Sequence, residues 1–247
     1  MDQIIANLNA KLDFLNTLIS VFQENKVEIP LEPYTESVEI TKRALLLTKR
    51  MYRLRYVICK FASIAEYTVL NKEENTAVTK DLVFDYEVYM NHICVEFCIL
   101  LGLSKSGGSS DNPNRVFNDA IKLSKKSKEL NVQNTFLNID GYIPTFNYAV
   151  KKLNQFKNGY SKEMQDIKDI RDQYAAHHDL DFNIDSINTN VIIYGFIELT
   201  NVWYEMCRAI GVISDITEHK VKKWSIDDYD KEITRIYELS FNMSRMK

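Results

Sequence analysis

The stretch Ser161-Lys-Glu-Met-Gln-Asp-Ile-Lys-Asp-Ile-Arg-Asp-Gln-Tyr-Ala-Ala-His-His-Asp179 places an arginine and two histidines near the end of one expected helix. Ser161 is positioned to accept a hydrogen bond from a backbone N–H group of the first turn. Neither proline nor glycine interrupts the stretch, and its apolar residues recur at helical spacing: Met164, Ile167, Ile170 and Tyr174. The pattern therefore predicts a helix that buries one stripe of side chains.

The remainder of the chain has the same helical character. Its 247 residues include only seven glycines and four prolines, so breaks in the helical pattern are few. Helical periodicity covers residues 2–25, 34–70 (one long helix or two), 80–103, 115–129, 145–156, 187–210 and a last segment from Ser225. The predicted fold class is therefore all-α.

His92 lies in a run that is apolar almost all round, and we expect it to be a hydrogen-bonded core residue.

Arg171 and His177 bring phosphate chemistry to the end of this helix. The planar guanidinium group of arginine matches the oxygens of a phosphate, and a histidine side chain can accept and return a proton near neutral pH. An ordinary core helix needs neither group. The pair is therefore the candidate catalytic site.

The residues Arg171-Asp172-Gln173-Tyr174-Ala175-Ala176-His177 resemble the signature of the HEPN superfamily, most closely its AbiU-type abortive-infection branch. The resemblance covers roughly residues 80–210. It implies an antiparallel helical bundle, residues 76–247, preceded by extra N-terminal helices in residues 1–75. It also implies a metal-independent endoribonuclease without a cofactor, acting as a homodimer, and a role as a toxin or antiviral defence effector with an antitoxin or another defence protein as partner.

The spacing of the motif has a geometric consequence of its own. Six residues along an unbroken α-helix rotate a side chain by about 120° relative to its start, so Arg171 and His177 diverge. Either the helix distorts before His177, or a second subunit related by a two-fold axis completes the site. His178 lies seven residues after Arg171, on the same face and about 10 Å further along, and is the competing histidine.

The predicted reaction is cleavage of single-stranded RNA to 2′,3′-cyclic phosphate and 5′-hydroxyl ends. His177 would transfer a proton, while Arg171 would bind the scissile phosphate. Asp172 stands where the family most often has asparagine or another polar residue; it can orient the arginine but also offsets positive charge. Glu96 is an unusual carboxylate in an apolar run, and it is a candidate to orient Arg171.

Three other interpretations of the motif remain open. His177, His178, Asp179 and Asp181 offer possible metal ligands, although adjacent histidines on a helix point about 100° apart. The histidines can instead stabilise the end of a helix through its dipole. The third interpretation keeps the fold without catalysis: a helical module that binds a protein partner or RNA.

Two groups of cations are candidate RNA contacts in a chain whose net charge is −3. The first lies among Tyr52 and Tyr56 and comprises Lys42, Arg43, Lys49, Arg50, Arg53, Arg55 and Lys60. The second comprises Lys122, Lys125, Lys126 and Lys128. For each group the alternative is a solvated helix face, with the tyrosines of the first group packed inward.

The cysteines, the N-terminus and the apolar runs of the sequence also predict where in the cell the protein is located. The cysteines Cys59, Cys94, Cys98 and Cys207 lack metal-ligand spacing and are expected to be reduced core residues. The N-terminus lacks the pattern of a signal peptide, and no apolar run approaches about 18 residues. We therefore expect a cytoplasmic protein that does not associate with a membrane.

Overall fold

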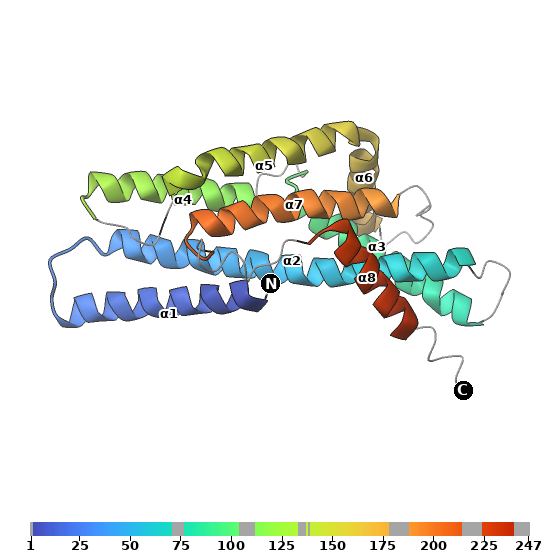
Figure 1. The fold of residues 1–247 in the computed structure, drawn as a ribbon, viewed down its shortest axis with the longest axis horizontal. Coiled ribbons are helices and arrows are strands. Elements are labelled where there is room, and N and C mark those ends of the chain that lie inside the picture. The colour runs from blue at the N-terminus through green and yellow to red at the C-terminus, as the bar shows by residue number, and fades with distance from the viewer. Residues whose placement is uncertain are drawn as a thin grey trace. The chain divides into compact units, whose positions relative to one another are not determined.

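The computed structural model describes residues 2–70, 77–103, 112–132, 137, 139–177, 188–213 and 224–239, with the backbone alone at 68–70, 77–84 and 173–177. Within these residues all regular secondary structure is helical, which confirms the all-α prediction (Figure 1). The helices are α1 (Asp2–Glu24), α2 (Glu32–Leu70), α3 (Ala77–Leu100), α4 (Pro113–Glu129), α5 (Ile139–Gly159), α6 (Ser161–His177), α7 (Thr189–Ala209) and α8 (Ile226–Tyr237). Within the described ranges, none of these helices combines the length and apolar character that crossing a bilayer requires.

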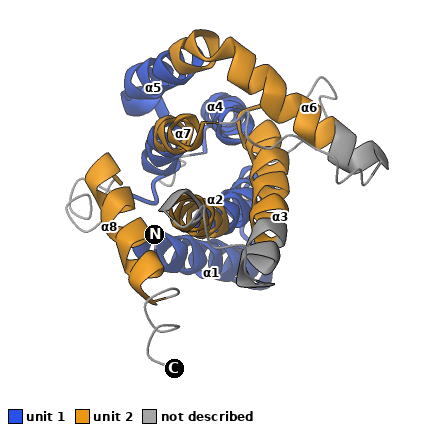
Figure 2. Ribbon diagram, turned by 90° about the vertical axis from the view of Figure 1, so that its right-hand side faces the viewer, with its two compact units in different colours: residues 1–52, 108–154, 200–223 blue, residues 53–107, 155–199, 224–247 orange. Residues whose placement is uncertain are grey.

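The chain forms two compact units, and each unit is assembled from three separate segments (Figure 2). Unit 1 comprises residues 1–52, 108–154 and 200–223, and unit 2 comprises residues 53–107, 155–199 and 224–247. Consequently α2, α5 and α7 each contribute residues to both units. The sequence-based division into residues 1–75 and 76–247 stays a prediction.

Unit 1 joins the beginning of the chain to the end of α7. The side-chain amide of Asn7 donates a hydrogen bond to the carbonyl of Val212 at 3.0 Å, and the ammonium group of Lys11 donates one to the carbonyl of Ile210. Gly211 ends α7 with a φ of 72°, a conformation that glycine adopts without strain. These contacts anchor α1 on carbonyl groups that the end of a helix leaves without intrahelical partners.

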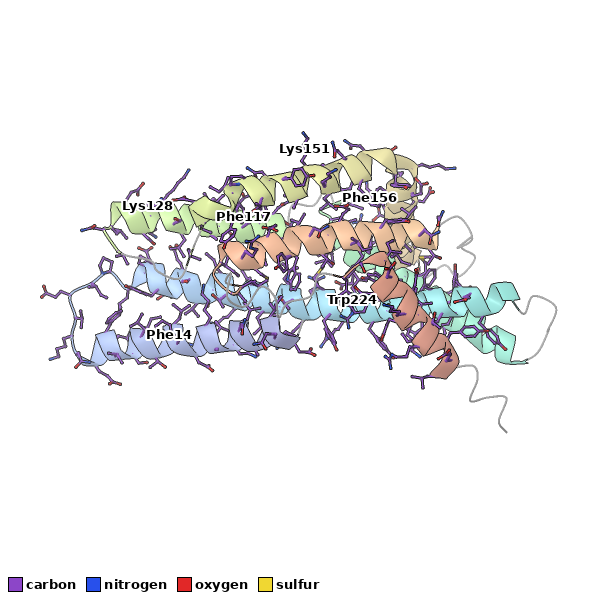
Figure 3. All side chains as sticks on the ribbon, in the orientation of Figure 1. Phe14, Phe117, Lys128, Lys151, Phe156 and Trp224 are labelled. Atoms are coloured by element: carbon purple, nitrogen blue, oxygen red, sulfur yellow. The ribbon has the colours of Figure 1, made fainter. Side chains whose placement is uncertain are left out.

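Two further contacts hold the interior of unit 1 together. The ring of Phe117 on α4 stacks on Phe146 of α5 with 3.6 Å between centroids (Phe117 is labelled in Figure 3). The indole N–H of Trp203 donates to the hydroxyl of Thr48 at 3.0 Å, so the polar groups of both buried residues are paired. Pairing matters here because a buried polar group without a partner costs about 1–3 kcal/mol.

Unit 2 is built around α3, which packs against α6. Gly102 ends α3 with a φ of 65°, and the ammonium group of Lys157 donates to the carbonyl of Leu101 at 3.4 Å. At Gly195 of α7 the backbone approaches so closely that a Cβ would lie 2.9 Å from the ring of Phe156 (labelled in Figure 3) and 3.1 Å from that of Phe97. The absence of a side chain at Gly195 therefore permits this packing.

The last helix docks on α2 within unit 2. The carbonyl of Ile233 accepts a hydrogen bond from the hydroxyl of Ser63 at 3.2 Å. The guanidinium group of Arg55 lies 3.8 Å from the ring centroid of Trp224, which precedes α8. At the start of α8, the backbone N–H of Ser225 donates to the carboxylate of Asp228 at 3.0 Å, which agrees with the prediction that Ser225 caps this helix.

The structure settles one open prediction about the helices and corrects two others. Residues 34–70 belong to one helix rather than two. α5 begins at Ile139 rather than near residue 145, and it includes Pro144 as its sixth residue, where proline lacks the N–H group that would bond the carbonyl four residues earlier. His92 is exposed rather than buried, because α3 turns one face, with Asp85 and Val88, toward solvent.

Candidate functional site

The buried face of α6 fixes the position of the motif. Met164, Ile167 and Ile170 are 4%, 0% and 1% exposed, as the helical spacing predicts. The thiol of Cys98 on α3 lies 4.0 Å from the carbonyl of Ile167, close to the position at which the motif starts. Three buried side chains and the packing against α3 therefore hold Arg171 on a rigid element.

Arg171 forms an ion pair with the next residue. Its Nε and one terminal nitrogen donate to the same carboxylate oxygen of Asp172, at 2.8 Å and 2.6 Å. The arginine side chain is 19% exposed, whereas the aspartate side chain is 62% exposed. The pair thus lies at the surface, with the guanidinium group partly covered and the carboxylate in contact with water.

The surroundings keep the arginine charged. Burial alone lowers the pKa of Arg171, but the hydrogen bonds to Asp172 and an interaction with Cys98 oppose that effect and produce a net upward shift. Burial raises the pKa of the Cys98 thiol to about 11, although the charge of Arg171 acts in the other direction. Near neutral pH the guanidinium group is therefore a permanent cation beside a neutral thiol.

The backbone of α6 is helical through His177. The structure thus favours the second of the two geometric alternatives, because a helix that continues through the motif turns His177 about 120° away from Arg171. The side chain of His177 and all of His178 lie outside the described residues. Completion of the site by a second subunit stays a prediction.

The other candidate residues have different positions. Glu96 is half-buried on α3, two residues before Cys98, so its side chain leaves the helix about 200° from that of Cys98. Its role toward Arg171 stays a prediction. The proposed metal ligands, His177, His178, Asp179 and Asp181, have no described side chains, and elsewhere in the described part of the chain no three His, Cys, Asp or Glu residues form a group that can hold a metal ion.

Sequence reasoning missed Cys98 as a neighbour of Arg171. It assigned this residue to the core, which is correct, since Cys98 is completely buried. The sequence around Cys98 does not reveal which residue of another helix packs against it. The crossing of α3 and α6 decides which side chains meet (Figure 2). The contact became apparent only when the packing of these two helices was known.

No family model, curated protein or solved structure matches the chain. The functional assignment therefore rests on the residues of α6 and on the helices that hold them.

Proposed function

We propose that the chain is a metal-independent endoribonuclease of the HEPN type that cleaves single-stranded RNA. One observation carries the proposal: α6 places Arg171 on a rigid, anchored helix and continues as a helix to His177, at the spacing of the HEPN signature. Arginine and histidine supply what RNA cleavage requires, a cation for the phosphate and a group that transfers protons.

In the proposed reaction the ribose 2′-hydroxyl attacks the adjacent phosphorus, and the bond from phosphorus to the 5′-oxygen breaks. His177 of one subunit removes the proton of the 2′-hydroxyl, and His177 of a second subunit protonates the leaving 5′-oxygen. Arg171 stabilises the negative charge that builds up on the phosphate oxygens. The products are a 2′,3′-cyclic phosphate and a 5′-hydroxyl.

A homodimer is part of this proposal. Arg171 and His177 diverge on the helix, and a two-fold axis beside α6 would bring Arg171 of one subunit toward His177 of the other. The same proposal places the protein in the cytoplasm, as a toxin or antiviral defence effector whose activity an antitoxin or another defence protein restrains.

The test is cleavage of an end-labelled single-stranded RNA by the purified protein in excess chelator, followed by analysis of the product ends. We expect cleavage that the chelator leaves unchanged and products with cyclic phosphate ends. Failure of the folded dimer to cut a mixture of cellular RNAs under these conditions would contradict the proposal. Cleavage that stops when the chelator is added would contradict its metal-independent mechanism.

The pair formed by Arg171 and Asp172 favours a second candidate function, a helical module that binds a protein or RNA without cutting it. The carboxylate occupies the donor edge formed by Nε and a terminal nitrogen, which is one of the edges that can bind a phosphate. A guanidinium group neutralised in this way binds phosphate less strongly. The motif of a non-catalytic module can carry such a pair without any loss of function.

Asp172→Asn distinguishes the two functions. In a ribonuclease, asparagine removes a negative charge beside the phosphate site, and we expect kcat/KM for RNA cleavage to rise about tenfold, equivalent to about 1.4 kcal/mol. The matched control is Asp169→Asn, the same change on the same helix, because Asp169 accepts its hydrogen bond from Gln165 at 2.7 Å. No cleavage by the wild type and by either variant would favour the non-catalytic module.

A further inference from the structure

The middle of α2 lacks acidic residues over an unusual length. Between Glu39 and Glu66 the sequence contains no aspartate or glutamate but seven cations, in a chain whose net charge is −3. Some of these cations have partners: Arg43 pairs with Asp119 at 2.7 Å, and Lys42 pairs with Glu39 at 2.7 Å. Three of the seven, Arg53, Arg55 and Lys60, lie further along the helix, in the part that belongs to unit 2.

In unit 2 this charge lies beside exposed aromatic rings. Arg53 is exposed, and Tyr56, three residues later on the same face of α2, is 50% exposed. The solvated-face interpretation expected the tyrosines to pack inward, and Tyr56 does not. An exposed ring beside a cation offers a face on which a nucleic-acid base can stack.

Neighbouring helices extend the surface. Arg55 lies against the face of Trp224 at 3.8 Å, and this contact orients its guanidinium group. Tyr56 lies near enough to Arg235 on α8 and to Tyr89 on α3 to act on the pKa of each of them. We call this group the α2–α8 surface; it comprises Arg53, Arg55, Tyr56, Lys60, Trp224 and Arg235 (Trp224 is labelled in Figure 3).

Acidic groups also lie around this surface, and one of them is bound to a cation of the surface. Glu232 accepts two hydrogen bonds from Arg235, at 2.6 Å and 3.0 Å. Asp85 lies near Tyr89, on the α3 side. Asp227 and Asp230 on α8, and Glu238 directly after it, are also exposed. Their charges limit the affinity for a polyanion, so we expect binding that depends on close contacts with Arg53 and Tyr56.

We propose that the α2–α8 surface binds single-stranded RNA, with a base stacked on Tyr56 and phosphates held by Arg53 and its neighbouring cations. Arginine side chains match phosphate oxygens, and an exposed ring stacks on any base, so this combination fits a single strand. A folded duplex would hide the faces of its bases. The proposal rests on the proposed function for the choice of RNA as the ligand, since the surface would hold the strand that α6 cuts.

The test measures binding separately from cleavage. A fluorescent 2′-O-methyl oligouridine is titrated with the full-length protein, and its anisotropy gives the Kd at several salt concentrations. This RNA lacks the 2′-hydroxyl nucleophile and cannot be cut by the proposed reaction. A failure of the cleavage proposal therefore leaves the binding measurement intact, and the reverse also holds.

We expect Tyr56→Ala to weaken binding about 5- to 150-fold, the loss of one stacked base, and Tyr56→Phe to keep nearly wild-type affinity. Arg53→Gln should reduce the slope of log K against log salt concentration by about 0.7, the loss of one phosphate contact on a single strand. Matched controls lie on α5: Tyr148→Ala, a tyrosine 62% exposed with Lys152 5.7 Å away, and Lys151→Gln, an exposed lysine (labelled in Figure 3).

Three outcomes would overturn the proposal. The first is the absence of binding by a wild-type protein that circular dichroism shows to be folded. The second is an equal loss of affinity in Tyr148→Ala and Tyr56→Ala, because the strand would then not distinguish the two tyrosines. The third is binding to vesicles of phosphatidylserine and phosphatidylcholine that Arg53→Gln weakens while RNA does not compete, since the surface would then recognise lipid.

Discussion

Replacing His177 with alanine is expected to reduce the rate of RNA cleavage by about 10²- to 10⁴-fold without unfolding the protein. One positioned proton-transfer group contributes this range to a reaction rate, and the variant homodimer lacks both histidines, so the range is the smallest loss expected. The effect should appear in kcat, because the imidazole acts on the reacting atoms and contributes little to binding of the strand. Initial rates on an end-labelled RNA, measured from pH 5 to pH 9 for both proteins, provide the check.

His178→Ala is the matched control, because it removes the same side chain one position later. We expect this variant to retain most of the activity. If His178→Ala loses activity and His177→Ala does not, the proton-transfer role belongs to His178, the residue that shares the face of Arg171. The pH profile gives a second criterion, since the wild-type rate should follow the titration of a histidine and the rate of the His177→Ala variant should not.

Arg171→Ala is expected to lower kcat by about 10²- to 10³-fold, the usual effect of removing one group that stabilises charge in the transition state. Arg171→Lys should recover part of this loss, because it keeps the positive charge but lacks the paired donors that match a phosphate. Lys168→Ala is the control, since Lys168 is a cation three residues earlier on the same helix whose charge, like that of Arg171, acts to lower the pKa of the Cys98 thiol. An equal loss in Lys168→Ala would mean that general positive charge matters rather than the guanidinium group.

Mixing the two inactive proteins tests the two-fold site. The heterodimer of an Arg171→Ala subunit with a His177→Ala subunit retains one arginine and one histidine, on different chains. If the two residues meet across the two-fold axis, exchange of subunits should raise the activity above that of the His177→Ala homodimer but leave it well below wild type, because the mixed site regains one of its two histidines. Mixtures as inactive as their components, despite confirmed exchange, would contradict a shared site.

Local features of the fold could be predicted from the sequence. The glycines at 102 and 211 end helices as expected, and the buried stripe of α6 follows its 3.6-residue period. Both features depend on a few neighbouring residues, which the sequence shows directly. The start of α5 was placed too late, because proline beyond the first turn usually ends a helix, whereas α5 accommodates Pro144 as its sixth residue.

Features that depend on packing could not be predicted. His92 was assigned to the core because its run is rich in apolar residues, but composition does not reveal which face of α3 its neighbours leave open. The approach of Cys98 to Arg171 and the docking of Trp224 beneath Arg55 follow from the crossing of helices distant in sequence. Of the candidate site, the helix and its arginine were predictable, whereas the partners of the arginine beyond Asp172 were not.

Because unit 1 is assembled from segments distant in sequence, it cannot complete its folding early during synthesis on the ribosome. α1 contacts the backbone carbonyls of Ile210 and Val212, which are synthesised about 200 residues after it. At about 5–20 residues per second, α1 waits roughly 10–40 s before these partners emerge. During that interval its buried face, with Ile4, Leu8 and Leu15, has no native cover from the end of α7. Nascent chains of this protein should therefore depend on chaperones until the end of α7 emerges, and unit 1 should complete its folding only after that point.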